Sequence, residues 1–532
     1  MNEQRAVADY VVVGTGSSGA VLANRLSADP HTTVVALEAG PADTDKFVHI
    51  PAAFSKLFRS ERDWDYLTEP QSGLGGRRIY WPRGKTLGGS SSMNAMMWVR
   101  GYAADYDDWA RLADESWSFA NVLRYFRRIE RVEGAADTDT GDSGPLRISN
   151  QRSPRPLTAA FLDAAREQGF PIERANTAAP EGFSQTMVTQ NRGARWSTAD
   201  AYLRPARRRR NLTVLTEAHA TRVLFEGSVA VGVEYLQGGV RRTVRAAREV
   251  ILCGGAVNSP QLLMLSGIGD KRQLERHGIE VRQHRPEVGR NLSDHLVSML
   301  GYSVESDSLF AAEKLPQLVD YLVRRRGMLT SNVGEAYGFV RSRAELDLPD
   351  LEMIFAPAPF FDEGLVPAAE HGAVIGTILL KPASRGEVSL RSADPKDKPI
   401  IDPRYLTDAG GADRTAMLSG LRRADALATS PALKGRLGRT IRPANADRLG
   451  VDEVIELALQ RNSHTLYHPV GTCRMGSDAD SVVAPDLRVR GVDRLRVADA
   501  SIMPTIIRGH THAPCVVIGE KAADLVLGTP RG

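Results

Sequence analysis

Three glycines near the N-terminus follow a short apolar run and lead into a helical stretch: Gly14, Gly16 and Gly19. The first permits a tight turn, the second lets the backbone approach a pyrophosphate, and the third lets the helix pack close to the strand. A second apolar run, 34–37, ends at Glu38, an acidic residue suited to the hydroxyls of an adenosine ribose. Because these parts fall in register, the pattern predicts a dinucleotide-binding βαβ unit.

The chain is long enough for several domains. Its 532 residues correspond to two to four domains of roughly 150 residues each. Hydrophobic residues make up 42% and charged residues 25%, so the composition is that of a soluble globular protein. No apolar run reaches the roughly 18 residues of a membrane span, and no apolar signal segment precedes the first predicted strand. We therefore expect a cytoplasmic protein, with peripheral contact to the inner face of the membrane left open.

Charge and cysteine content exclude other classes. The net charge is +4, from 68 basic and 64 acidic residues, so we expect no nucleic-acid partner. Two arginine runs, 207–210 and 324–326, lie at the ends of predicted helices, where cations suit the helix dipole. We favour solvated helix ends for both, although the first also suits anionic lipid or nucleic acid. The three cysteines have no CxxC spacing, so neither a disulfide framework nor a zinc ribbon is indicated.

The order of the predicted elements indicates that one domain is inserted into another. β-rich sequence over 212–244 and a buried strand at 249–255 belong with the first βαβ unit. From about 299 to 461, strand-like segments alternate with helices such as 315–325, and no glycine-rich phosphate loop is present. The last 70 or so residues return to nucleotide-domain character, with a strand at 495–498 and a helix at about 513–527.

A second glycine-rich segment runs from Arg83 to Gly101. Several adjacent backbone N–H groups there are free to face an anion or an isoalloxazine edge. Its GKT sequence is not a P-loop, because the glycine required five positions before Gly84 is Ile79. On its own the segment is equally well explained as a plain Gly/Ser loop.

Two histidine pairs lie near the C-terminus, His464 with His468 and His510 with His512. Histidine is the side chain best suited to accept a proton near neutral pH. The spacing also suggests zinc, but no carboxylate pattern supports it and Pro469 interrupts the helix that the first pair would need. We therefore predict no metal site. A buried structural role remains the alternative for His464 and His510.

Taken together, these segments resemble the glucose-methanol-choline (GMC) flavoprotein oxidoreductases, and among them the choline dehydrogenase-like bacterial branch. Two motifs of that family are present in full, at 84–94 with Trp98 and Gly101, and at 255–269. The resemblance covers essentially the whole chain, because further family-like segments lie at 288–295, 384–386 and 498–504.

The expected fold is α/β (α+β), with a Rossmann-like FAD-binding domain assembled from discontinuous segments. A substrate domain built on an antiparallel sheet flanked by helices is inserted into it. The resemblance implies FAD rather than NAD as the cofactor. We assign 1–155, 196–298 and 462–532 to the FAD-binding domain, and 156–195 and 299–461 to the substrate domain.

The resemblance also implies the residues that hold FAD. Glu38 binds the adenosine ribose, the backbone near Val223 meets the adenine, and residues 88–91 line the pyrophosphate and ribityl. The flavin attachment is expected to be non-covalent, because Met93 stands where some members carry the histidine that forms the link. The predicted cofactor-binding set is Gly14, Gly16, Ser17, Ser18, Gly19, Glu38, Arg83, Gly88, Gly89, Ser91, Asn94, Ala95, Met96, Val223, Asp499 and Ala500.

The implied activity is oxidation of a primary alcohol, choline or another small alcohol, to the aldehyde. His468 accepts the hydroxyl proton, flavin N5 accepts the hydride, and His512 holds the alcohol oxygen. A quinone-like or other electron acceptor would reoxidise the flavin. The alternative functions are an oxidase that produces hydrogen peroxide, a hydroxynitrile lyase, a light-driven decarboxylase and a non-catalytic flavin protein. The quaternary ammonium of choline needs an aromatic box and a carboxylate. Candidates for these groups are Trp98, Tyr467, Phe355, Phe360, Phe361, Glu335 and Glu352. We favour a packing role over choline binding for these residues.

Overall fold

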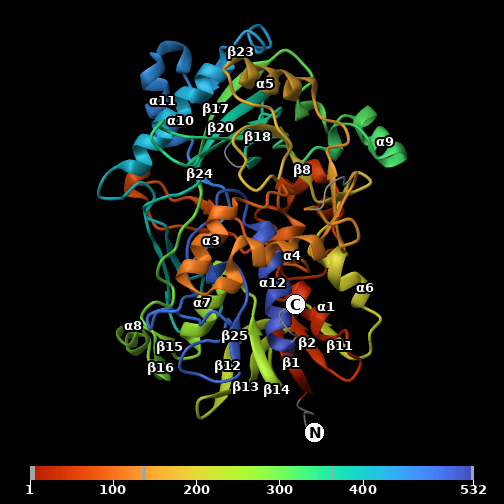
Figure 1. Cartoon of the computed structure of the whole chain (residues 1–532), viewed down its shortest axis with the longest axis vertical. Coiled ribbons are helices and arrows are strands. Elements are labelled where there is room, and N and C mark those ends of the chain that lie inside the picture. Colours follow the sequence, from red (N-terminus) through yellow and green to blue (C-terminus); the bar gives the residue numbers. More distant parts are fainter. Residues whose placement is uncertain (1–5, 135–138, 362–363, 529–532) are drawn as a thin grey trace.

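Two seven-stranded sheets, one toward each end of the elongated molecule, organise the fold (Figure 1). The computed structural model describes residues 6–134, 139–361 and 364–528. Segments from the two ends of the chain meet in the lower half of Figure 1, where the N-terminal strands lie beside the C-terminal helix. The chain therefore crosses between the two halves several times, as the expected insertion requires.

The first sheet carries the dinucleotide fold. Its strand order is β11-β2-β1-β14-β13-β12, and β25 pairs with β14. Five strands form the parallel part of the sheet: β1, β2, β11, β14 and β25. The remaining two, β13 and β12, extend the sheet from β14 in antiparallel pairs. β2 is buried at every position, as is typical of a parallel sheet covered on both faces. The bounds are β1 Ala6–Val13, β2 Val34–Leu37, β11 Leu212–Leu215, β12 His219–Glu226, β13 Val229–Gln237, β14 Val240–Leu252 and β25 Leu495–Val497.

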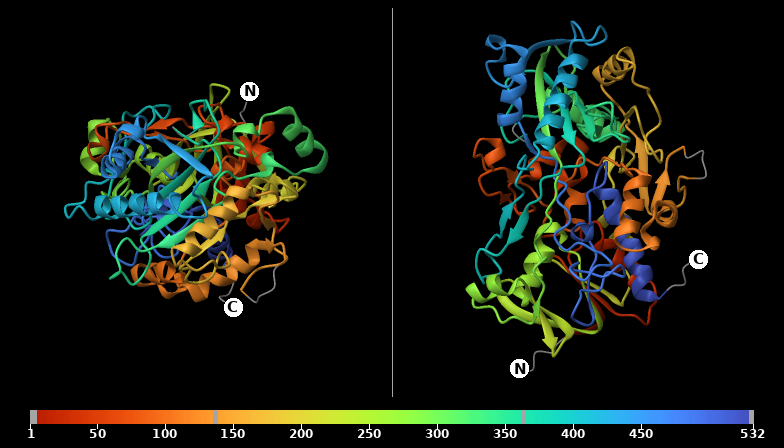
Figure 2. Two further views of the ribbon diagram at one scale, coloured as in Figure 1. Left: turned by 90° about the horizontal axis from the view of Figure 1, so that it is seen from above. Right: turned by 60° about the vertical axis from the view of Figure 1, so that its left-hand side comes forward.

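The second sheet is antiparallel throughout, in the order β23-β17-β20-β19-β18-β7, with β24 also paired to β17. Three helices flank it, α5 (Pro156–Glu167), α10 (Ala412–Ala428) and α11 (Val451–Arg461), as the views of Figure 2 show. The bounds are β7 Phe183–Gln185, β17 Leu296–Val304, β18 Ala336–Val340, β19 Leu351–Ala356, β20 Gly372–Leu379, β23 Leu437–Arg442 and β24 His464–Thr465.

The other helices connect or cover the sheets. α1 packs against the C-terminal helix α12 on the first sheet, and α7 follows β14 directly. Their bounds are α1 Gly19–Leu26, α2 Lys46–His49, α3 Ala103–Leu112, α4 Phe119–Ile129, α6 Arg204–Ala206, α7 Gly255–Leu265, α8 Lys271–Arg276, α9 Leu315–Arg324 and α12 His512–Leu527. The short strands are β3 Tyr66–Leu67, β4 Tyr80–Trp81, β5 Glu130–Val132, β6 Leu146–Asn150, β8 Met187–Val188, β9 Gln190–Asn191, β10 Ala194–Arg195, β15 Ile268–Gly269, β16 Gln283–His284, β21 Glu387–Ser389 and β22 Ile400–Asp402.

The predicted fold class is confirmed, and the differences are local. α7 begins at Gly255, earlier than the predicted helix at 260–265, and it contains Pro260. A proline within a helix leaves the carbonyl four residues earlier without its N–H partner. Here the Thr472 hydroxyl donates to the Ala256 carbonyl at 2.6 Å, which supplies that partner. The predicted domain boundaries stay a prediction, although β24 joins the second sheet from within the segment assigned to the FAD domain.

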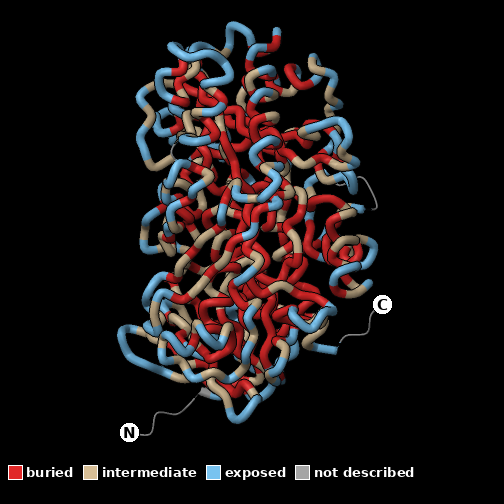
Figure 3. The backbone as a smooth tube through the Cα atoms, turned by 90° about the vertical axis from the view of Figure 1, so that its left-hand side faces the viewer, coloured by how far each residue is buried: buried red, intermediate tan, exposed pale blue. Residues whose placement is uncertain are grey.

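Buried backbone runs through the middle of the molecule from one sheet to the other (Figure 3). The two largest apolar clusters lie around the two sheets, and both include residues from distant parts of the chain. The three cysteines are free thiols, and Cys253 and Cys473 are buried. Among the helices of the described ranges, none has the length and apolar character to cross a membrane.

Candidate active site

A cavity of about 300 Å³ extends between the two sheets and joins two chemically different ends. We call them the dinucleotide end and the histidine end. The dinucleotide end is lined by glycines, backbone and carboxylates, among them Gly14, Gly16, Glu38, Gly89 and Asp499. The histidine end is lined mainly by apolar side chains and three imidazoles, among them Phe54, Phe58, Met93, Met97, Met299, Val333, Ile354, Phe360, His464, Leu466, Tyr467, His468 and His510.

The three glycines of the first motif have three different constraints. Gly14 has φ +95°, and a Cβ there would lie 2.5 Å from the Cys253 carbonyl oxygen. A Cβ on Gly19 would lie 1.9 Å from the Gly14 carbonyl oxygen, so Gly19 lets the helix approach the strand as predicted. A Cβ on Gly16 would have only the Gly89 Cα as a neighbour, at 3.8 Å. Gly16 therefore leaves open space in the cavity on the side where a side chain would project.

Glu38 lies at the end of β2, where the motif predicted the ribose-binding acid. Its carboxylate accepts hydrogen bonds from the Thr15 backbone N–H at 3.1 Å, the Thr15 hydroxyl at 2.8 Å and the Gly40 N–H at 3.1 Å. Burial raises the pKa of this carboxyl, and the hydrogen bonds oppose that shift. Since an ionised carboxylate has about four lone-pair sites, Glu38 retains acceptor capacity for a hydroxyl.

A buried arginine, which the sequence analysis did not identify, holds the second glycine-rich segment. The Arg195 guanidinium donates from Nη1 to Asn94 Oδ1 at 2.7 Å and to the Ser91 carbonyl at 3.1 Å. Burial lowers its pKa to about 9. The Ser91 hydroxyl donates to the Gly88 carbonyl at 2.6 Å, where Gly88 has φ +84°. These contacts hold the loop in the open conformation that an anion or a flavin edge needs.

Asp499 lies two residues after the end of β25 and connects the last segment of the chain to α7. Its carboxylate accepts from the Gly255 N–H at 2.8 Å, the Ser259 hydroxyl at 2.6 Å and the Ser501 N–H at 2.8 Å. Burial raises the pKa of Asp499. The contacts bring the predicted residues Asp499 and Ala500 to the cavity wall.

The hydrogen bonds of His295 determine the tautomer of His468. His295 Nε2 lies 3.1 Å from the Leu380 carbonyl oxygen, which only accepts, so Nε2 carries the proton. In neutral His295 the other nitrogen, Nδ1, is then an acceptor, and it lies 2.9 Å from His468 Nδ1. His468 therefore donates from Nδ1, and its Nε2 keeps a lone pair. These hydrogens are assigned from the hydrogen-bond network.

Both imidazoles of this pair are neutral near pH 7. Burial lowers the pKa of His295 to about 3. Burial lowers the pKa of His468 well below its ordinary value of 6.5, and the positive charge of Arg83 lowers it further. His468 lines the cavity, so a neutral imidazole with a basic Nε2 is available there.

His510, and not His512, lies against His468. The rings of His468 and His510 are 4.8 Å apart between centroids, and His510 Nε2 lies 3.0 Å from Glu352 Oε1. His512 is the first residue of α12, and its Nδ1 lies 3.0 Å from the Ser17 hydroxyl in the first glycine motif. Burial lowers the pKa of His512 to about 4, and its Nε2 has no hydrogen-bond partner among the described residues.

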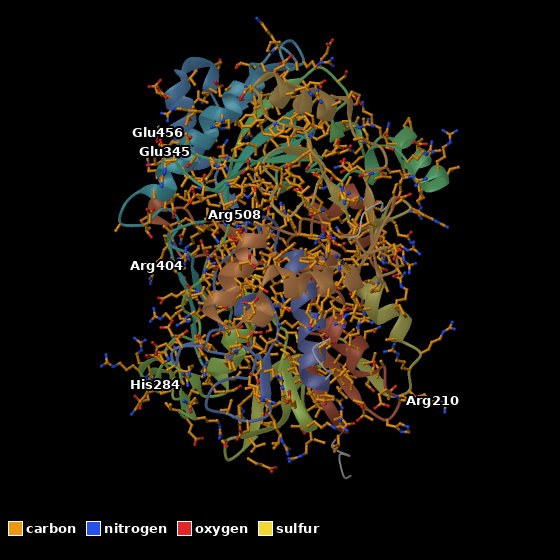
Figure 4. The ribbon with its side chains drawn as sticks, viewed as in Figure 1. Arg210, His284, Glu345, Arg404, Glu456 and Arg508 are labelled. Carbon is orange, nitrogen blue, oxygen red and sulfur yellow. The ribbon has the colours of Figure 1, made fainter. Side chains whose placement is uncertain are left out.

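Arg508 fixes the loop that carries His510. Figure 4 shows Arg508 in the central region of the molecule, whereas the other labelled side chains lie nearer its periphery. Its guanidinium donates to Asp105 of α3 at 2.5 Å and to the Pro349 carbonyl at 2.8 Å. The Arg508 backbone N–H also donates to Asp105, at 2.6 Å. These contacts connect the loop to both halves of the molecule.

Most of the predicted cofactor-binding residues line the cavity, and three do not. Gly19 and Gly88 act through backbone packing, and Val223 donates its backbone N–H to the Ser266 hydroxyl at 2.9 Å. Near the expected adenine position, Ala218, His219 and Ala220 line the cavity instead. The lining members are Gly14, Gly16, Ser17, Ser18, Glu38, Arg83, Gly89, Ser91, Asn94, Ala95, Met96, Asp499 and Ala500.

The histidine end offers no carboxylate from the described part of the substrate domain. Glu335 accepts from the hydroxyls of Ser331 and Thr158, both at 2.6 Å, and Glu352 binds His510. Neither carboxylate lines the cavity. Of the aromatic residues considered for a choline box, only Phe360 and Tyr467 do so.

No group of three or more metal-ligating side chains is present in the described residues. The glycine cradle, the open face of Gly16, the acceptor on Glu38 and the unpaired Nε2 of His512 fit a dinucleotide such as FAD.

The sequence matches the family described as GMC oxidoreductase over residues 8–297 and again over residues 382–519. This chain is a GMC oxidoreductase. The two matched stretches include the N-terminal dinucleotide motif and the C-terminal segment that carries His468, His510 and His512 in this chain.

Three relatives in the family extend over nearly the whole chain. An uncharacterized GMC-type oxidoreductase of Mycobacterium tuberculosis is 67% identical over 97% of this chain and 99% of its own length. An alcohol dehydrogenase [acceptor] of Pseudomonas putida is 42% identical, over 98% and 95% of the two chains. The mitochondrial choline dehydrogenase of Homo sapiens is 41% identical, over 99% and 91%.

The fold also matches a solved structure. The crystal structure of pyridoxine 4-oxidase from Mesorbium loti superposes with a TM-score of 0.88, at 32% identity, over 97% of this chain and 98% of that chain. This GMC oxidoreductase thus shares its fold with a pyridoxine 4-oxidase.

Proposed function

We propose that this chain oxidises primary alcohols with an apolar body to aldehydes, with FAD held non-covalently at the dinucleotide end. One observation carries the proposal: neutral His468, with its Nδ1 occupied by His295, lines the same cavity as the glycine motifs. Alcohol oxidation requires a base for the hydroxyl proton beside a hydride acceptor. The relatives named as alcohol and choline dehydrogenases support this reaction class.

Different residues of the chain accept the proton, position the substrate and bind the cofactor. His468 Nε2 accepts the hydroxyl proton, and His295 keeps that nitrogen unprotonated beforehand. His510 lies beside His468 and is placed next to the alcohol oxygen, while Glu352 accepts from its Nε2 and fixes the orientation of the ring. Held by the glycine motifs and Glu38 at the dinucleotide end, FAD would supply the acceptor for the hydride that leaves the alcohol carbon. His510 thus takes the role that the sequence analysis assigned to His512, which we place at the dinucleotide end beside Ser17.

The walls of the histidine end favour an apolar substrate body over choline. Phenylalanine, methionine and isoleucine side chains surround it, and neither Glu335 nor Glu352 lines the cavity. A quaternary ammonium would lose water there without a carboxylate to replace it. Transfer of an aliphatic or aromatic chain from water into this apolar end would be favourable.

An anaerobic screen tests this function. Purified holoprotein is mixed with primary alcohols of increasing chain length and with choline, and flavin bleaching is followed by stopped flow. We expect bleaching by apolar alcohols that is faster than bleaching by choline, and little bleaching in His468→Ala. Faster reduction by choline would overturn the substrate assignment, and cleavage of a cyanohydrin without bleaching would identify a lyase.

Reoxidation and acid treatment test the remaining assignments. We expect faster reoxidation by quinones than by oxygen, and none by NAD; stoichiometric hydrogen peroxide at the dye-coupled rate would identify an oxidase. Because Met93 cannot form the histidyl link, trichloroacetic acid should release FAD into solution. Flavin that precipitates with the protein would reveal another covalent attachment.

A further inference from the structure

Helix α9 (Leu315–Arg324) turns its apolar face away from the protein. Five apolar residues of this helix follow the i, i+3, i+4, i+7, i+8 spacing of one helical stripe. In an ordinary surface helix this stripe packs on the core. Here the fractional exposure is 70% for Leu315, 61% for Leu322 and 76% for Val323, and the stripe is completed by Leu318 and Val319.

The opposite face of α9, which contacts the protein, is largely polar. Tyr321 is its one buried residue, and the Tyr321 hydroxyl donates to the His49 carbonyl at 3.2 Å. Gln317 Oε1 accepts from the Met328 N–H at 3.3 Å, and Asp320 pairs with Arg324 at 3.5 Å. The helix is thus amphipathic with its apolar side toward the surroundings, and an exposed apolar stripe of this kind marks a surface for interaction with a protein or a membrane.

Basic side chains surround the exposed stripe. Lys314 precedes the helix, and Arg324, Arg325 and Arg326 end it, all four exposed. The acidic residues nearby already have partners: Glu313 binds Lys56 at 2.7 Å and Asp320 binds Arg324. An apolar stripe flanked by cations is the pattern of helices that lie in the interface of an anionic membrane. A second copy of this chain would instead bring like charges together across an isologous interface.

The position of α9 suits contact with a flat surface. The helix projects from the side of the upper half of the molecule in Figure 1, and it also projects in the view from above in Figure 2. Beneath it lies an apolar cluster that contains Tyr321 and Met328 and packs against Val333 and Phe360. Val333 and Phe360 also line the histidine end of the cavity.

We propose that α9 docks this protein on an anionic lipid surface, with the five apolar residues inserted among the acyl chains and the four cations at the headgroups. Docking places the apolar cluster under α9, and with it the histidine end, next to the bilayer. If the proposed function holds, an apolar alcohol reaches that end from the lipid phase.

Vesicle flotation of the holoprotein tests the docking without any assay of activity. Phosphatidylcholine vesicles with and without phosphatidylglycerol are compared. We expect binding to the anionic vesicles that weakens as salt is added. The double variant Leu322→Asp/Val323→Asp should bind at least tenfold less, because it places two charges in the apolar stripe.

The double variant Arg324→Gln/Arg326→Gln should lose about fivefold in affinity for anionic vesicles for each arginine. Arg325 is kept, because it has φ +52° and stacks on Tyr321.

Val451→Asp is the matched control, because Val451 is 58% exposed at the start of another helix, α11. It should bind vesicles like the parent, and circular dichroism and melting temperature should show that all variants fold. A parent that stays free of anionic vesicles, or equal binding by Leu322→Asp/Val323→Asp, would overturn the proposal. So would a vesicle-independent dimer that this variant abolishes in sedimentation, since the stripe would then join two copies of the chain.

Discussion

The dinucleotide end of the cavity is built largely from backbone, whereas the histidine end is built from side chains. At the first, Gly14, Gly16 and Gly89 bring two loops into contact. At the second, His295, His468 and His510 converge from different parts of the chain. A backbone site depends on conformations that few residues adopt, and a side-chain site depends on protonation and orientation. Substitutions at the dinucleotide end should therefore impair stability or FAD binding, whereas substitutions at the histidine end should impair the reaction itself.

The largest effect is expected at the histidine end. Replacing His468 by alanine removes the proposed base, and flavin reduction by alcohol should slow by about 100- to 10,000-fold. FAD should remain bound, since the glycine motifs and Glu38 are unchanged. Stopped-flow reduction and the flavin absorbance of the purified variant measure the two outcomes.

The companion substitutions separate His510 from His512. His510→Ala should slow reduction strongly, because it lies against His468. His512→Ala should change the reduction rate much less, because its Nδ1 contacts Ser17 at the dinucleotide end. The reverse ranking would restore His512 to the substrate and remove the proposed role of His510.

The next effect concerns the partners that orient the two imidazoles. His295→Leu removes the acceptor for His468 Nδ1, and Glu352→Leu removes the acceptor for His510 Nε2. Loss of such an orienting partner typically costs 10- to 100-fold in metal sites, and we expect about tenfold or more here. Glu352→Gln keeps an acceptor oxygen and should retain more activity than Glu352→Leu. Equal rates for Gln and Leu would show that Glu352 does not orient His510.

The contrast between the two ends also explains what could be predicted from the sequence. The dinucleotide end is encoded in contiguous motifs whose glycines have local conformational reasons, so Gly14, Gly16 and Glu38 could be assigned directly. His510 and His512 are separated by one residue, and the start of α12 at His512 decides which ring faces His468. Glu352 and Arg195 carry no local motif. Only the tertiary fold brings them to His510 and Asn94.

Helix α9 shows the same limit of sequence patterns. Its periodicity correctly predicted a helix over 315–325, and the structure ends it at Arg324. Periodicity identifies an apolar stripe but not whether that stripe packs on the protein or faces outward. The arginines at 324–326 were therefore interpreted as a solvated helix end, and their position beside an exposed stripe became evident only in the fold.

A matched pair of glycine substitutions tests the backbone character of the dinucleotide end. Gly14→Ala should destabilise the fold by about 1–3 kcal/mol, because φ is +95° and the new Cβ would meet the Cys253 carbonyl. Gly16→Ala meets no protein atom closer than 3.8 Å, so it should leave the apoprotein stable and weaken FAD binding instead. Denaturant unfolding of the apoproteins and FAD titration distinguish these results. Equal stability losses would contradict the separate constraints assigned to Gly14 and Gly16.

The smallest expected effect is an acid-dependent loss of stability from buried neutral histidines. Burial lowers the pKa of His295 to about 3 and that of His512 to about 4, while the unfolded chain titrates near 6.5. Below pH 6.5 the unfolded state therefore binds more protons than the folded state, so stability falls as the pH drops toward the folded pKa values. Each histidine should contribute about 1.4 kcal/mol per pH unit to the loss of folding stability in that window.

Denaturant unfolding of the parent and His295→Leu between pH 7.5 and about 5 measures this slope. The variant, which lacks one such histidine, should show a shallower slope; identical slopes would mean that His295 is not held neutral, and would weaken the assignment of a basic Nε2 on His468.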